Sequence, residues 1–383
     1  MNLFINPLNI IIVGVFLTVF TGIFAYNGIN LLPAKSIFEL LIISVSLLSI
    51  IKLKKTFVLF SFLSLFYIAF GYLATFYFYN NFSLYDFFIS YKSFFYLLLL
   101  TPFIGKKYIT ENSFKNFFLF LLLFFFLKYF FSRFIFEQPR PGLFVENNFE
   151  LLFFLLLYLL VCLIDKKIFI LKLCVVTIIV FASGSRSAIL SLLFLIFMTY
   201  EKKLSFKTLI GFIIFAFIFS LSIIVLMQRL GGGIESIDRF VFFQYFLNDI
   251  SNWSFSDYFF GNLPLTPMSA NTCNGLSFYY TLFSQKNDGT CYSVVLHSYI
   301  LRMIYDHGFF GLFFVLYFIF KALRTVGYNV KLCLTVLGLI LINGLSVSAF
   351  NSVFCFLGLL FFLVVDRDFV VFAREKQTIR FRK

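Results

Sequence analysis

The feature that most constrains this chain is a series of long apolar runs that recurs from one end of the sequence to the other. About 20 apolar residues cross a bilayer as a helix, and a helix pairs every backbone group within itself. The ten-residue segments of alternating hydrophobicity that a membrane β-barrel requires are absent. The sequence therefore predicts an all-α polytopic membrane protein.

Composition supports this fold class, because 61% of the 383 residues are hydrophobic and only 13% are charged. A soluble domain cannot bury so much apolar surface. We expect a single integral membrane domain over residues 1–383, with about twelve membrane-spanning helices. The predicted spans are 8–26, 36–51, 56–79, 86–104, 114–132, 149–164, 168–183, 187–200, 208–227, 309–323, 332–349 and 351–366.

The distribution of basic residues predicts how these spans are oriented. Lysine-rich clusters fall on alternate loops, and the positive-inside rule places them, with both termini, in the cytoplasm. The opposite, outer side receives the one long hydrophilic segment, residues 228–308, in which IDRFVFFQYFLNDI predicts a short helix. The net charge of +14 does not indicate a nucleic-acid partner, because the basic residues are scattered over short loops.

A second set of cations lies on the outer side, against the orientation rule, and consists of arginines. A guanidinium group binds phosphate oxygens in a two-pronged way that an ammonium group cannot, so this set suggests an anionic ligand such as a lipid diphosphate. Pairing with nearby acidic residues or with lipid headgroups is the alternative for each of them. The arginines are Arg133, Arg140, Arg186, Arg229, Arg239 and Arg302.

Histidine and cysteine are placed unevenly in the sequence. The only two histidines, His297 and His307, directly precede an apolar run, and a neutral imidazole at the water edge can accept a proton from a hydroxyl. A lone interfacial histidine can equally be an ordinary surface residue. Cys273 and Cys291 share the outer segment, where they are candidates for a disulfide in an oxidising compartment. No Cys/His spacing suggests zinc, and we expect neither a metal nor a cofactor.

Four stretches resemble a known family. HSYILRMIYDHGFFG, with His-Ser ahead of Gly-x-x-Gly, resembles the signature of bacterial O-antigen ligases and the related O-antigen and capsule polymerases. RPGLFVENNFELLFF, SGSRSAILSLL and DRFVFFQ resemble three further stretches of that superfamily, in the same order along the chain. The resemblance extends from Arg140 to Gly311.

The resemblance implies glycosyl transfer on the periplasmic face of the bacterial inner membrane. The donor is a glycan on undecaprenyl diphosphate, the acceptor is a sugar hydroxyl of a second glycan, and no metal is required. The other implied partners are membrane lipids and a chain-length regulator. The implied roles are acceptor-activating base for His297, diphosphate binding for Arg186, Arg239 and Arg140, and a substrate contact for Glu146. Arg302 and Asp306, four residues apart, are expected to form a helix pair, and a substrate contact is the alternative for Arg302.

Two other functions remain open. An O-antigen ligase would transfer the glycan to lipid A–core, but its pattern continues after the second glycine with two threonines. Here Leu312 and Phe313 follow Gly311, which favours the polymerase. A lipid-oligosaccharide transporter would also have many spans and buried charges. It is less favoured because the halves show no repeat and the polar groups gather at the outer end.

Overall fold

The computed structural model describes residues 6–25, 28–50, 54–79, 82–165, 169–199, 238–263, 265–286 and 288–366. Every element within these ranges is a helix, and the only β pairing there is an isolated bridge between Ile109 and Val365. The all-α prediction is therefore confirmed for the described part of the chain. The predicted span 208–227, the start of the outer segment and the basic tail lie outside the described residues.

The helices of the amino-terminal half follow the apolar runs closely. They are α1 (Pro7–Ile23), α2 (Ala34–Leu48), α3 (Lys55–Phe78), α4 (Leu84–Ser90), α5 (Lys92–Leu100), η1 (Thr101–Phe103), α6 (Glu111–Phe134), α7 (Asn147–Ile164), α8 (Phe169–Ala182) and α9 (Arg186–Thr199).

The carboxy-terminal half begins with short helices and continues with longer apolar ones. Its elements are α11 (Asp238–Asp249), α12 (Phe255–Phe260), α13 (Ala270–Gly275), η3 (Ser277–Leu282), η4 (Ser293–Leu296), α14 (Tyr299–Thr325), α15 (Val330–Ser346), η5 (Ala349–Asn351) and α16 (Val353–Val364).

Four of the described helices are long and apolar enough to cross a membrane: Phe57–Phe78 within α3, and the whole of α6, α7 and α14. Six further apolar helices are shorter, with 10–17 residues each. The chain thus has the character of a helical membrane protein that its composition predicts.

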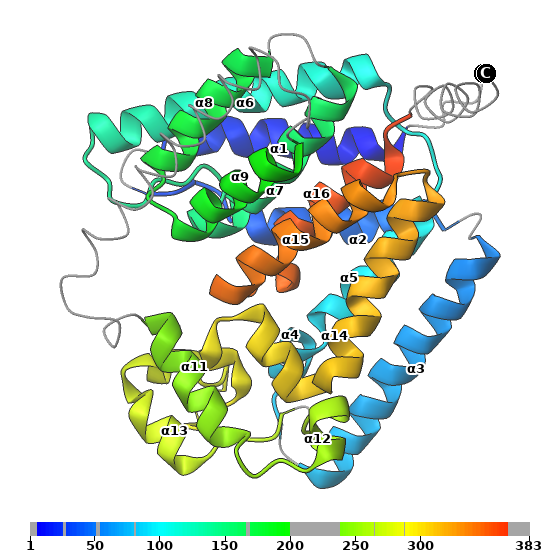
Figure 1. The fold of residues 1–383 in the computed structure, drawn as a ribbon, viewed down its shortest axis with the longest axis vertical. Coiled ribbons are helices and arrows are strands. Elements are labelled where there is room, and N and C mark those ends of the chain that lie inside the picture. The colour runs from blue at the N-terminus through cyan, green and yellow to red at the C-terminus, as the bar shows by residue number, and fades with distance from the viewer. Residues whose placement is uncertain are drawn as a thin grey trace.

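Helices α7 and α16 form the centre of the bundle. Every residue of α16 is buried. In the most apolar 18-residue stretch of α7, 78% of the residues are buried, whereas in that of α3 only 17% are. The two central helices approach closely at Gly358, where a Cβ atom would lie 2.6 Å from the Leu156 side chain. Small residues at such crossings allow helices to pack tightly in a membrane, where water does not drive them together. Helix α3 lies at the edge of the bundle (Figure 1).

Two predicted spans differ in the structure. The run 86–104 is divided into α4, α5 and η1. At the break after α4, the Ser90 carbonyl lies 3.1 Å from His307 Nε2 and the Ser90 hydroxyl donates to the Asp306 carboxylate, so contacts with α14 engage the last residue of α4. The run 309–323 belongs to α14, which begins ten residues earlier. Its start is capped by the Ser298 hydroxyl, which accepts a hydrogen bond from the Leu301 amide.

The short helices α11, α12 and α13 gather beside the starting end of α14, away from the carboxy terminus (Figure 1). Residues 259–261 lie directly on a break in α14 at Gly308, which has a φ of 63°. A Cβ atom at Gly308 would lie 2.2 Å from the Phe259 carbonyl oxygen, so only glycine fits this crossing. The Asn262 amide also donates to the Tyr305 carbonyl, at 2.8 Å. This outer region is therefore fixed on α14.

Candidate functional site

The turn between α15 and α16, residues 346–352, meets the start of α14 and the candidate base. The Tyr299 amide donates to the Val347 carbonyl at 3.2 Å, and the Ser348 hydroxyl donates to the His297 carbonyl at 3.1 Å. His297 itself is half-buried and directly precedes α14. The turn therefore holds the backbone that carries the His297 imidazole.

Arg239 reaches the same turn from a different part of the chain. It lies in the first turn of α11, and its Nε donates to the Ser346 carbonyl at 3.4 Å. One helical turn later, the ring of Phe242 lies 5.5 Å from the His297 ring, measured between centroids. Two residues that the sequence predicts as site residues, 58 positions apart, thus lie on neighbouring parts of one surface.

Arg302 also contacts this turn, from the first part of α14. Its side chain is buried, and Nη1 donates to the Ser348 hydroxyl at 2.9 Å. The other two guanidinium nitrogens, Nε and Nη2, are buried without a hydrogen-bond partner among the described residues. A buried guanidinium group without a carboxylate partner is energetically costly, which is typical of a functional residue.

Arg186 lies at the same end of the bundle, as the packing of α9 against α15 shows. Asn343 of α15 donates to the Ser191 hydroxyl at 2.7 Å, and Gly338 lies against the Phe194 ring. The two helices are therefore antiparallel, and the start of α9 is level with the end of α15. This register places Arg186, which is half-buried, near the turn at 346–352.

Two of the family-like stretches contact each other directly. The Asn148 side-chain oxygen at the start of α7 accepts from the Ser185 hydroxyl at 2.6 Å and from the Ser187 hydroxyl at 3.4 Å. Asn147 donates to the Ser183 carbonyl at 2.8 Å. The serine-rich turn that carries Arg186 is therefore held by the start of α7.

The structure does not connect Arg140 and Glu146 to the turn at 346–352 in the same way. Both side chains are exposed, and the Glu146 carboxylate accepts a hydrogen bond from Asn148 at 3.2 Å. Arg140 forms no hydrogen bond or ion pair within the part of the chain that the structure describes. Their predicted roles as a third cation and as a substrate contact stay predictions.

The acidic residue that organises this region is Glu150, which the sequence reading missed. Its buried carboxylate accepts from the backbone amides of 143–145, at 2.7, 2.6 and 3.0 Å, and from the Tyr129 hydroxyl at 2.6 Å. These bonds fix the loop that links Arg140 to α7. An acidic residue inside an apolar run was the available signal, because such residues are rarely placed in a span without a reason.

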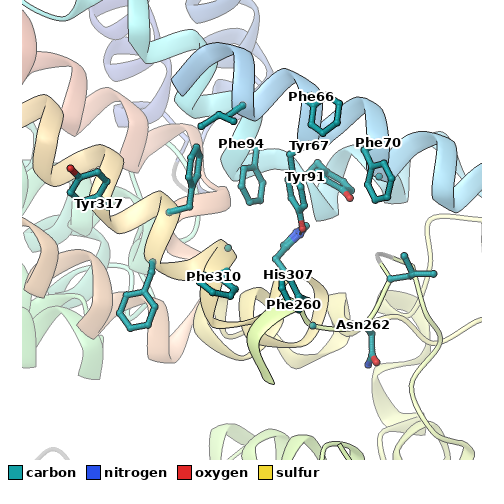
Figure 2. A pocket seen from close by; sticks show the side chains of 17 residues that line it. Phe66, Tyr67, Phe70, Tyr91, Phe94, Phe260, Asn262, His307, Phe310 and Tyr317 are labelled. Atoms are coloured by element: carbon teal, nitrogen blue, oxygen red, sulfur yellow. The ribbon is translucent and has the colours of Figure 1, made fainter. Parts of the chain in front are cut away.

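The second histidine lies in different surroundings. His307 is buried, with Nδ1 at 2.8 Å from the Tyr67 hydroxyl and Nε2 at 3.1 Å from the Ser90 carbonyl. It contributes to a cavity of about 720 Å³ between α3 and α14, where its ring points toward Tyr67 (Figure 2). The lining is largely aromatic and includes Phe66, Phe70, Phe310 and Phe314. Both imidazole nitrogens are engaged, so His307 is part of the packing between α14, α3 and α4.

Cys273 and Cys291 lie together, as a disulfide would require. The two side chains are close neighbours, and both thiols are free in this structure, so the disulfide stays a prediction. The backbone of Met268 joins the pair, since its amide donates to the Cys291 carbonyl and its carbonyl accepts from the Cys273 thiol. Burial raises the pKa of both thiols above the ordinary cysteine value.

The site can therefore combine one imidazole with guanidinium groups from several helices, an arrangement suited to an anionic ligand and a proton transfer. Within the described ranges, no group of three or more His, Cys, Asp or Glu side chains could hold a metal ion. Comparisons of the chain with known protein families, with curated proteins and with solved structures return no match.

Proposed function

We propose that this chain is a membrane glycosyltransferase that polymerises lipid-linked repeat units of an O-antigen or capsule. In this proposal, about twelve spans cross the bacterial inner membrane, both termini are cytoplasmic and the site faces the periplasm. The observation that carries the proposal is the convergence of His297, Arg239 and Arg302 on the turn at 346–352. Arg239 comes from α11 and bonds to the Ser346 carbonyl, whereas Arg302 and the His297 carbonyl, both at the start of α14, bond to the Ser348 hydroxyl.

The proposed reaction is a single displacement at the anomeric carbon of the donor sugar. The His297 imidazole accepts the proton of the acceptor hydroxyl while the acceptor oxygen forms a bond to the anomeric carbon. The bond between that carbon and the phosphate oxygen breaks, and the polyprenyl diphosphate leaves with the bonding electrons. General-base assistance of this kind contributes about 10²–10⁴ in rate.

The arginines act on the leaving group in this scheme. Negative charge grows on the bridging phosphate oxygen as the bond breaks, and a fixed guanidinium group stabilises it without reorganisation. Arg239 and Arg186 supply this charge from α11 and α9, and Arg140 is a third candidate from the loop before α7. A single displacement inverts the anomeric configuration, and retention in the product, determined by NMR, would contradict this step.

The ligase differs from the polymerase only in its acceptor, and the transporter differs in performing no bond exchange. In this structure Gly311 lies against the His307 side chain, where a Cβ atom would approach to 2.5 Å. The Gly-x-x-Gly pattern therefore has a packing role in α14 whichever acceptor is used. The residues after Gly311 are those that favour the polymerase in the sequence.

The experiment is complementation of a host that lacks its own polymerase, retains its ligase and carries the matching repeat-unit genes. Wild type is compared with His297→Ala, Arg239→Ala and Arg186→Ala at equal membrane levels. Arg133→Ala is the matched control, because Arg133 is an outward arginine at the end of α6 that, among the described residues, donates only to the Gln138 carbonyl, at 3.4 Å.

We expect a ladder of glycan lengths from wild type and the control, and a single repeat from the three site variants. If wild type gives no ladder but restores glycan attachment in a ligase-deleted host, the chain is a ligase. Ladders from all variants would show that these residues do not carry the reaction.

A further inference from the structure

The backbone of His297 adopts a conformation that is unfavourable for a residue with a side chain. Its φ is 55° and its ψ is −24°, in the left-handed region. This conformation costs a residue with a Cβ atom roughly 1–2 kcal/mol and persists where surrounding contacts hold it. The His297 amide contributes little, because its bond to the Val294 carbonyl is 3.4 Å long. Support comes from the imidazole ring, which packs beside Phe242 and Tyr279, and from the carbonyl side.

The carbonyl side is held by one hydroxyl whose direction is unambiguous. Ser348 lies 3.1 Å from the His297 carbonyl, which can only accept, and 2.9 Å from Arg302 Nη1, which can only donate. The Ser348 hydroxyl therefore donates its single proton to His297 and accepts from Arg302. The guanidinium group fixes the orientation of the hydroxyl, and the hydroxyl in turn fixes the His297 carbonyl.

Burying the Arg302 guanidinium group at this position carries a desolvation cost that its contacts offset only in part. The side chain is 4% exposed and forms one hydrogen bond, and no carboxylate lies within ion-pair distance among the described residues. Asp306, one turn further along α14, commits its carboxylate to the Ser90 and Ser293 hydroxyls. A well-packed apolar side chain would stabilise the helix as well or better.

We propose that Arg302 is a positioning residue for His297, acting through Ser348. The chain Arg302–Ser348–His297 holds the candidate base in its left-handed conformation and so aims the imidazole that flanks α11. This inference rests on the proposed function for the role of the imidazole as a base, whereas the positioning itself concerns only the resting protein.

The first test therefore measures position without activity. His297 and His307 are the only histidines, so diethyl pyrocarbonate modification of each can be followed by mass spectrometry. Ser348→Ala should change the modification rate of His297 at least about threefold and leave buried His307 unchanged. Ser346→Ala is the matched control, because the carbonyl of Ser346, and not its hydroxyl, contacts Arg239. Equal His297 rates in wild type and Ser348→Ala would overturn the positioning role.

The second test uses transfer activity with a purified lipid-linked donor. Ser348→Ala should lower kcat about 10–100-fold, as expected for a misplaced catalytic group, and leave the donor KM within about twofold. Ser348→Thr, which retains the hydroxyl, should recover most of the rate. Arg302→Lys should lower kcat in the same way. The double variant Ser348→Ala/Arg302→Lys should have a kcat no lower than that of the slower single variant, since both residues act through the same series of hydrogen bonds.

The outcomes distinguish the positioning role of Arg302 from the proposed transferase function. A raised donor KM in Arg302→Lys, with kcat unchanged, would show that Arg302 binds the donor directly and would overturn the positioning role. A changed His297 modification rate combined with no transfer by wild type would leave the positioning intact and refute the proposed function.

Discussion

Replacing Glu150 by glutamine tests how the loop that carries Arg140 is held. The carboxylate has only acceptors, and four donors converge on it: three backbone amides from 143–145 and the Tyr129 hydroxyl. The side-chain amide of glutamine would put an NH₂ group where one of the two oxygens accepts. If it replaces Oε2, two backbone amides lose their acceptor. If it replaces Oε1, the hydroxyl can rotate but one backbone amide remains unpaired.

Each buried amide left unpaired costs about 1–3 kcal/mol, and glutamine should adopt the orientation that leaves only one amide unpaired. Glu150→Gln should therefore lower the free energy of unfolding by about 1–3 kcal/mol. The assay is thermal and denaturant unfolding of the purified protein in lipid nanodiscs. Glu146→Gln is the matched control, since within the described part of the chain that exposed carboxylate accepts only from Asn148. A Glu150→Gln protein as stable as the control would show that the four donors do not depend on a carboxylate.

Three further predictions concern other parts of the fold. Gly308→Ala should destabilise the protein strongly in thermal unfolding, because φ is 63° and a Cβ atom would lie 2.2 Å from a backbone oxygen. Gly28→Ala, which meets nothing within 4 Å, should be nearly neutral, and equal losses would contradict the packing argument. Lys128→Met should lower the free energy of unfolding by about 1–3 kcal/mol, because the buried ammonium group donates to three backbone carbonyls at and just after the end of α1. An unchanged melting temperature would refute this. After reduction, Cys273 and Cys291 should react with iodoacetamide more slowly than free cysteine at pH 8, because a raised pKa lowers the thiolate fraction. Their reaction rates should increase as the pH rises. A rate equal to that of free cysteine at pH 8 would contradict their burial.

The helices were largely predictable from the sequence, and the reason is physical. An apolar run in a membrane must pair its backbone groups within itself, so the run and the helix coincide, as in α6 and α7. The division of 86–104 was not predictable, because the break follows Ser90, which contacts Asp306 and His307 more than 200 positions away. The orientation of the bundle and the number of spans stay predictions.

The candidate site was predictable in part. The sequence motifs indicated His297 and Arg239, Arg302 was expected only as a helix-pair residue or a substrate contact, and the structure brings all three to one turn. The sequence held no signal for Ser348, because its role arises only when two chain segments about 50 residues apart meet. Glu150 did carry a signal, because it is an acidic residue in an apolar run. A motif-based search does not single it out, since its role is to hold the backbone of the preceding loop.

The most direct test of the central claim is a reconstituted transfer assay. The purified chain in nanodiscs receives a polyprenyl-diphosphate-linked repeat unit as donor and a second such unit as acceptor, without divalent metal. New glycosidic bonds and released polyprenyl diphosphate are counted together. We expect one polyprenyl diphosphate to be released for each glycosidic bond formed. Both bond formation and diphosphate release should be lost in His297→Ala and Arg239→Ala. Bond formation that persists in these variants, or movement of intact donor across a bilayer with no bond formed, would contradict it.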